Sequence, residues 1–100
     1  MYAIIWEYQV KPDRLIEFEE IYSENGAWVE LFRHSPGFLG TELLADRGHP
    51  GRFITIDRWA SARDYEEFLS ASKEEYADLD TQFEELTESE NLVGKWESVG

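Results

Sequence analysis

The chain has 100 residues and a net charge of −13, with 22 acidic and nine basic side chains. So acidic a chain is a poor partner for nucleic acid or an anionic membrane surface, because both bind through cationic patches. The absence of cysteine excludes disulfides, zinc–thiolate sites and a thiol nucleophile. The size predicts a single domain over residues 1–100. No apolar stretch is long enough for a membrane span or a signal peptide, so the expected location is cytoplasmic.

The first part of the chain predicts a strand followed by two helical segments. In residues 2–10 every second side chain, starting from residue 2, is apolar or aromatic, and this alternation is typical of a strand. Pro12 and Asp13 are typical of a helix start, because proline has no N–H to lose there and an acid suits the positive end of the helix. The first helix would bury one stripe, formed by Leu15, Phe18, Ile21 and Tyr22. A second segment follows and would end at residues 35–37.

The middle of the chain predicts a pair of strands, at residues 38–46 and 52–60, around a segment rich in turn formers. We expect Leu43 to lie opposite Ile54, because this register gives one aliphatic face that suits packing against helices. The other face would be mixed in character and would carry Phe38, Glu42, Phe53, Thr55, Asp57 and Trp59.

Two further helices and a last strand complete the pattern. Ser61 and Ser72 each begin a capping box, with an acid three residues later. The last strand is expected at residues 92–99. The resulting order is β-α-β-β-α-β, so the sequence predicts an α+β fold of the ferredoxin-like type, with a four-stranded antiparallel sheet.

A sheet of this topology has helices on one face only. The predicted open face would carry large rings such as Phe53 and Trp59 beside acids such as Glu7 and Asp57. Exposed rings of this size favour burial against another protein surface, and the same sheet of a second copy is the simplest such surface. We therefore expect a homodimer in which two sheets face each other. The alternative is a monomer whose rings lie flat on an open face.

Several stretches of the sequence resemble the antibiotic biosynthesis monooxygenase family. They are YQVKP at 8–12, SPGFLGTELL at 35–44, FITIDRWAS at 53–61 and YEEF at 65–68. The most specific parts are the Pro-Gly-Phe turn and Trp59 followed six residues later by Tyr65. The resemblance covers nearly the whole chain and implies a dimeric α+β barrel.

The family's members differ in activity. It includes cofactor-independent oxygenases that oxidise polycyclic phenols to quinones, haem-degrading enzymes and members with no assigned activity. The haem-degrading branch uses an Asn, a Trp and a His at places that here hold Trp6, Phe68 and residues 76–78, so haem degradation is rejected. No metal site is expected either, because His34 and His49 have no ligand partner at a suitable spacing.

The quinone-forming branch has residues that match Trp59 and Tyr65, whereas its Asn, four residues before the Trp, is replaced by Thr55. The resemblance therefore implies an oxidation by O₂ without a cofactor, with Trp59 and Tyr65 in catalytic roles. Arg58 shares the parity of the predicted aliphatic face, and we expect it to stabilise an anion formed in the reaction. The alternatives are that Trp59 and Tyr65 only pack a strand–helix corner, and that Arg58 forms an ion pair.

The substrate is expected to be a small aromatic or hydrophobic molecule held between the sheet and the helices. The residues predicted to contact it are Trp6, Tyr8, Trp28, Phe32, Thr55 and Phe68. Two other functions stay open: a module that binds such a ligand without turnover, and a structural homodimer whose cavity is filled by its own rings. A cavity of roughly 300 Å³ or more would exclude the last.

Overall fold

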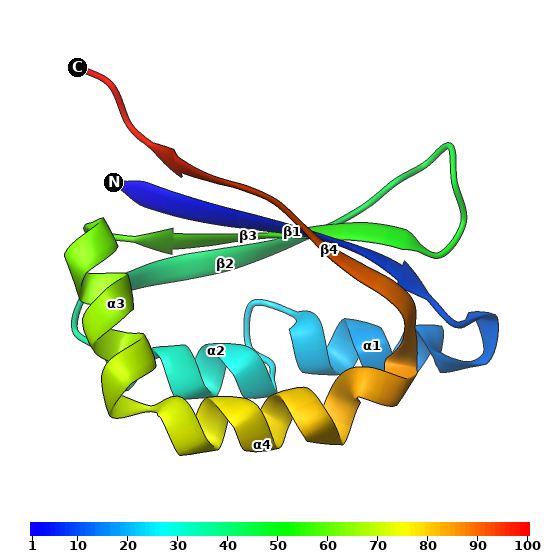
Figure 1. Ribbon diagram of the computed structural model, residues 1–100. Coiled ribbons are helices and arrows are strands. Elements are labelled where there is room, and N and C mark those ends of the chain that lie inside the picture. Colours follow the sequence, from blue (N-terminus) through cyan, green and yellow to red (C-terminus); the bar gives the residue numbers. More distant parts are fainter.

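The computed structural model describes residues 1–100 as a four-stranded antiparallel sheet with all the helices on one side (Figure 1). The elements are β1 Tyr2–Val10, α1 Leu15–Tyr22, α2 Ala27–Phe32, β2 Phe38–Ala45, β3 Arg52–Trp59, α3 Ala62–Ala71, α4 Lys73–Phe83 and β4 Thr87–Glu97. The strand order is β2-β3-β1-β4, which confirms the predicted ferredoxin-like α+β fold. None of the helices has the length and apolar character needed to cross a membrane.

Strand β1 lies inside the sheet, paired with β3 on one side and β4 on the other. Its alternate residues Ile4, Tyr8 and Val10 are each less than 5% exposed and pack against the helices. The helices contribute matching rings, among which Phe18 of α1 is fully buried. This agreement between the strand's period of two and the helix stripes explains why the core forms where the sequence pattern placed it.

The predicted register between β2 and β3 is wrong. Leu43 lies opposite Thr55, not opposite Ile54. The pairing follows the predicted register only at Phe38 and Trp59, and it then shifts by one residue at a bulge. The next paired residue of β2, Gly40, has φ +147, a conformation that glycine adopts without the cost a side chain would add. The bulge therefore sets the register of the rest of the strand pair.

The assignment of the two faces of β3 was also reversed. Phe53, Thr55, Asp57 and Trp59 are all buried and face the helices, although they were expected on the open face. The reason is that a shift of one residue in register moves every later side chain of β2 to the opposite face relative to β3. The face without helices carries apolar side chains from all four strands, namely Ala3, Ile5, Leu44, Ile54, Ile56 and Trp96.

The helix starts agree with the sequence only in part. The Ser61 hydroxyl accepts a hydrogen bond from the Asp64 N–H (3.1 Å), as a capping box requires. Ser72 makes no such bond, because it is shared between α3 and α4 and its N–H still donates to the Phe68 carbonyl. The last strand begins at Thr87, five residues before the predicted start.

Candidate functional site

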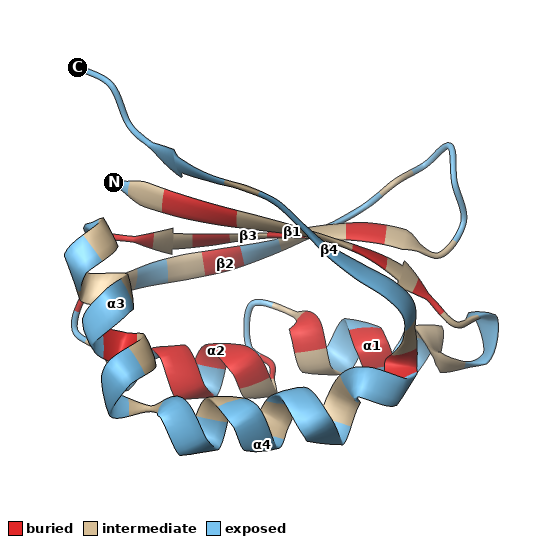
Figure 2. Ribbon diagram, viewed as in Figure 1, coloured by how far each residue is buried: buried red, intermediate tan, exposed pale blue.

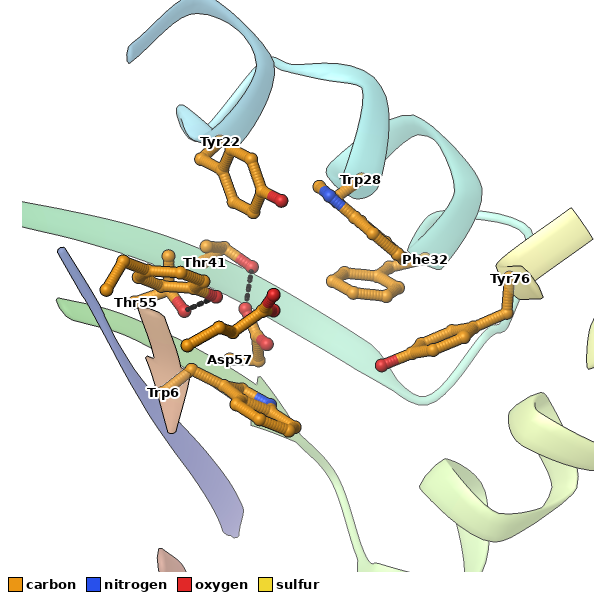
Figure 3. Close-up of a pocket in the computed structure, with 10 residues that line it drawn as sticks. Trp6, Tyr22, Trp28, Phe32, Thr41, Thr55, Asp57 and Tyr76 are labelled. Carbon is orange, nitrogen blue, oxygen red and sulfur yellow. Dashed lines mark hydrogen bonds between the residues drawn. The ribbon is translucent and has the colours of Figure 1, made fainter. Parts of the chain in front are cut away.

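A cavity lies between the helix-covered face of the sheet and helices α1, α2 and α4 (Figure 3). Its volume is about 30 Å³, which is room for a water molecule or two. Its wall is made by Trp6, Tyr8, Tyr22, Trp28, Phe32, Thr41, Thr55, Asp57, Tyr76 and Glu90. Six of these ten side chains are aromatic, so most of the wall is made of ring faces and edges.

The exposure of the wall residues locates the mouth of the cavity. Asp57, Thr55 and Phe32 are buried and form its inner part. Trp6 and Tyr76 are only partly buried, so they lie nearer to solvent. Glu90, from β4, is exposed. A ligand would therefore enter past side chains of β1, α4 and β4.

Asp57 is the main polar feature of the inner wall. The Thr41 hydroxyl donates a hydrogen bond of 2.7 Å to Asp57 Oδ1, and no cation pairs with the carboxyl group. Burial raises the pKa of Asp57 to about 6, and the Thr41 hydrogen bond offsets this only in part. The carboxyl group thus changes its protonation state close to neutral pH, and its second oxygen is not used within the chain.

A second hydrogen bond crosses the same wall. The hydroxyl groups of Tyr8 and Thr55 lie 2.8 Å apart, on the adjacent strands β1 and β3. Burial holds the pKa of Tyr8 well above its ordinary value, so this phenol stays neutral. The Thr55 hydroxyl is therefore already engaged with a neutral neighbour.

Five of the six side chains predicted to contact a ligand do line the cavity. They are Trp6, Tyr8, Trp28, Phe32 and Thr55. The sixth, Phe68, is buried behind them and packs edge-on against Phe32, with the ring centres 5.3 Å apart. The structure thus brings together most of the predicted aromatic wall, although none of these contacts is with a bound ligand.

Trp59 and Tyr65 do not belong to the cavity wall. Trp59 is fully buried in a cluster of rings, and the ring of Tyr65 meets it edge-on at 5.4 Å. Lys95 Nζ lies over the Tyr65 ring, 5.8 Å from its centre. The structure therefore places this pair in the packing of the corner between β3 and α3, and a catalytic role for either side chain stays a prediction.

The expectation that Arg58 lies on the helix-covered face is wrong. Its neighbours Asp57 and Trp59 face the helices, so Arg58 points to the opposite face of the sheet. There it forms an ion pair with Glu42 of the adjacent strand. Because the sheet separates Arg58 from the cavity, it cannot stabilise an anion there.

Five residues of the wall were not predicted from the sequence, namely Tyr22, Thr41, Asp57, Tyr76 and Glu90. Asp57 was missed because the wrong register put it on the open face, whereas Thr41 was expected on the helix-covered face but not as part of a ligand site. A usable signal was present in β1, whose residues 2, 4, 6, 8 and 10 are all apolar or aromatic. If this apolar set of β1 residues had been assigned to the same sheet face as residues 53, 55, 57 and 59, Asp57 would have been predicted to face the helices.

The chemistry of this wall is specific. It offers a carboxyl group that can accept a proton, tyrosine hydroxyl groups that can donate hydrogen bonds, and flat apolar rings, with no basic side chain. Such a site suits a neutral aromatic ligand and disfavours an anionic one. Nowhere in the chain are three or more His, Asp or Glu side chains grouped in a way that could hold a metal ion.

Solved structures share this fold at low sequence identity. SnoaB, a cofactor-independent oxygenase from Streptomyces nogalater, aligns with a TM-score of 0.78 at 18% identity, over 99% of this chain and 93% of that one. PA3566 from Pseudomonas aeruginosa aligns with a TM-score of 0.71 at 19% identity, over 99% of this chain and 94% of that one. At these identities the likeness establishes the fold alone. No curated protein matches the chain in sequence.

The sequence itself carries a family signature. The pattern described as "Antibiotic biosynthesis monooxygenase" matches residues 1–78, which hold every strand except β4 and every wall residue of the cavity except Glu90. The fold, its topology and this match agree with one another. The chain is therefore a member of the antibiotic biosynthesis monooxygenase family.

Proposed function

We propose that the protein is a cofactor-independent monooxygenase that oxidises a phenolic aromatic substrate with O₂. The observation that carries this proposal is the position of Asp57, a buried carboxyl group with a pKa of about 6 in an aromatic cavity. A base with a pKa near the working pH is well suited to remove a proton from a bound phenol. Family membership and the wall of rings support the same reaction.

The reaction balances without any other redox partner. The substrate gives up the hydrogen of one O–H bond and the hydrogen of one ring C–H bond. One oxygen atom of O₂ becomes a second carbonyl group on the ring, and the other leaves as water with both hydrogens. The products are a quinone and water, and the substrate supplies all four electrons. Asp57 takes the phenol proton first, because an ionised phenol passes an electron to O₂ far more readily than a neutral one.

The size of the cavity limits how the substrate binds. Its volume of about 30 Å³ admits the oxygen-bearing edge of a ring and not a whole polycycle. The rest of the substrate would then lie at the mouth, against the partly buried rings of Trp6 and Tyr76. Rings in this position also exclude water from a peroxy intermediate, which protects it from side reactions.

The proposal is tested by incubating the protein with a dihydroxyanthrone in air and under nitrogen. The protein is first treated with a chelator and shown by absorbance to be free of flavin. We expect quinone formation in air only, with one O₂ consumed for each quinone formed. An aerobic rate no higher than that of the protein-free solution would refute the proposed activity.

The Tyr65→Phe variant distinguishes the catalytic role that the family resemblance implies for Tyr65 from the position outside the cavity wall that the structure gives it. If the Tyr65 hydroxyl holds a reacting oxygen, its loss should lower the rate by about 10²–10³-fold. Because Tyr65 lies outside the cavity wall, we expect a change of less than about threefold. Steady-state kinetics with the melting temperature as a control for folding would decide, and a loss of the larger size would restore a catalytic role to this residue.

The small cavity also favours a second candidate function, a structural homodimer whose rings fill its interior. A volume of about 30 Å³ lies far below the roughly 300 Å³ of an ordinary ligand pocket. This candidate expects no binding of any aromatic ligand, whereas the oxygenase binds its substrate under nitrogen as well as in air. Calorimetric titration of the dihydroxyanthrone under nitrogen therefore distinguishes the two.

We propose in addition that a second copy of the chain covers the face of the sheet without helices. This face carries Ile5, Ile54 and Ile56 at its centre. Strand β4 is exposed along almost its whole length, and its Trp96 side chain is 57% exposed (Figure 2). Apolar side chains that extend across all four strands, beside the Arg58–Glu42 and Arg52–Glu7 ion pairs, are typical of an interface between subunits.

Ile56→Glu is expected to abolish this dimer, because it places an unpaired charge at the centre of the covered face. Light scattering should report about twice 11.7 kDa for the wild type and 11.7 kDa for the variant at micromolar concentration. Ile16→Glu is the matched control, since Ile16 is 75% exposed on α1 and should leave the mass unchanged. A wild-type particle of 11.7 kDa would contradict the proposed dimer.

A further inference from the structure

The proposed reaction gives no role to the hydroxyl group of Tyr22, which lies on the α1 side of the cavity wall. The two hydrogen bonds of the wall join Tyr8 to Thr55 and Thr41 to Asp57, and neither includes Tyr22. The residue is only 6% exposed, and Figure 3 shows its hydroxyl directed into the space between the sheet and α2. The hydroxyl oxygen is not among the fully buried polar atoms and has no acceptor within the chain, so it is a donor available to a ligand.

The ring of Tyr22 is held firmly by its neighbours. It stacks on Phe18 with the ring centres 4.3 Å apart and an angle of 17° between the planes. The ring of Tyr8 meets it edge-on at 5.2 Å from the sheet. Contacts of this kind fix the direction of the hydroxyl before any ligand arrives, which lowers the entropic cost of a hydrogen bond.

Trp28 adds a second polar group behind this hydroxyl. Its Nε1–H is buried and makes no hydrogen bond of good geometry within the chain. In Figure 3 the indole nitrogen faces the Tyr22 hydroxyl. Burial raises the pKa of Tyr22, and the Trp28 N–H lowers it only in part, so the phenol stays protonated and remains a donor.

We infer that Tyr22 donates a hydrogen bond to a ligand oxygen in this cavity, and that Trp28 is a positioning residue that acts through the Tyr22 oxygen. The ligand must then carry an acceptor oxygen, such as a ketone, at the edge that enters the cavity. This inference rests on the proposed function in assuming an aromatic ligand, but it requires neither O₂ nor turnover. It also gives two wall residues different roles: Asp57 accepts a proton and Tyr22 donates a hydrogen bond.

The test compares two ligands that differ by a single oxygen. 1-Tetralone and tetralin have the same bicyclic skeleton, and only tetralone has a ketone. Neither is a phenol, so their binding can be measured by ligand-observed NMR in air without any reaction. We define the ketone preference as the ratio of the two affinities, and we expect it to exceed one for the wild type.

Tyr22→Phe keeps the ring and removes the hydroxyl, so it should reduce the ketone preference by roughly three- to tenfold, the value of one hydrogen bond. The affinity for tetralin should not change. Tyr2→Phe is the matched control, because it removes a tyrosine hydroxyl that lies outside the wall. A ketone preference that survives Tyr22→Phe would overturn the inference, as would its absence from the wild type.

Trp28→Phe tests the positioning role. If Trp28 acts through Tyr22, Trp28→Phe should reduce the ketone preference when Tyr22 is present. In the Tyr22→Phe background the same substitution should cause no further reduction of the ketone preference. A purely structural role would instead weaken both ligands equally, which would contradict this part of the inference. A readout that needs no variant is the ¹³Cζ resonance of labelled tyrosine, where one of the five signals should shift with tetralone and not with tetralin.

The outcome is separable from that of the proposed oxidation. A ketone preference that depends on Tyr22 would stand even if no phenol is oxidised. Oxidation of the dihydroxyanthrone at full rate by Tyr22→Phe, with the ketone preference unchanged, would support the oxygenase and refute the role of Tyr22.

Discussion

Asp57→Asn is expected to lower the rate of phenol oxidation by about 10²–10⁴-fold, the usual contribution of a general base. Asn keeps the shape of the side chain and an oxygen that can accept the Thr41 hydrogen bond, so the wall should stay intact. It cannot take a proton from the substrate. The measurement is kcat/KM for the dihydroxyanthrone in air.

The pH profile gives an independent reading of the same residue. In the wild type, kcat/KM should rise as the pH increases through about 6, because Asp57 must be ionised to accept the proton. This limb should be missing from the residual activity of Asp57→Asn. Asp78→Asn is the matched control, since Asp78 is exposed on α4 and outside the wall. Unchanged activity in Asp57→Asn would remove Asp57 from the mechanism.

The second large effect concerns stability. The pKa of Asp57 is raised from 3.8 to about 6 in the folded chain, so the folded state binds more protons than the unfolded state between these values. The contribution of this carboxyl group is therefore most favourable below about pH 4 and is lost as the pH rises through 6. Above pH 7 the buried, ionised carboxylate costs about 3 kcal/mol relative to its protonated form.

Asp57→Asn removes this charge at every pH. We compare the free energy of unfolding of the variant with that of the wild type at the same protein concentration. The difference, variant minus wild type, should therefore increase by roughly 2 to 3 kcal/mol as the pH rises from 4 to 8. Urea unfolding at a series of pH values measures the difference. For Asp78→Asn the same difference should stay nearly flat. A pH-independent difference for Asp57→Asn would show that the carboxyl group is not buried as described.

An activity lost together with stability gained would identify Asp57 as a functional group. Structural residues usually cost stability when they are replaced. A side chain that is kept although its ionised form destabilises the fold has another reason to be there, and such conflicts are typical of functional sites.

The strands, the helices and their order could be predicted from the sequence because their signals are local. The alternation in residues 2–10 and the spacing of Leu15, Phe18 and Tyr22 depend only on the periods of a strand and a helix. The helix cap at Ser61 was predicted correctly for the same reason, because its partner Asp64 is only three residues away. Most of the aromatic wall followed from these periods, because the apolar stripe of each element has to face the common core.

The pairing of β2 with β3, and with it the character of the cavity, was decided only by the tertiary structure. One extra residue beside Gly40 shifts the register, and no periodicity in the sequence marks that place. With this shift Thr41 pairs with Asp57, so Asp57 faces the helices and Arg58 lies on the opposite face. Pairing energies between strands are summed over many contacts, so a bulge is set by the packing of the whole sheet rather than by its own residues. The sequence by itself thus determined the fold and the ring-lined interior, whereas the tertiary structure decided that a carboxyl group, and not a guanidinium, faces the cavity.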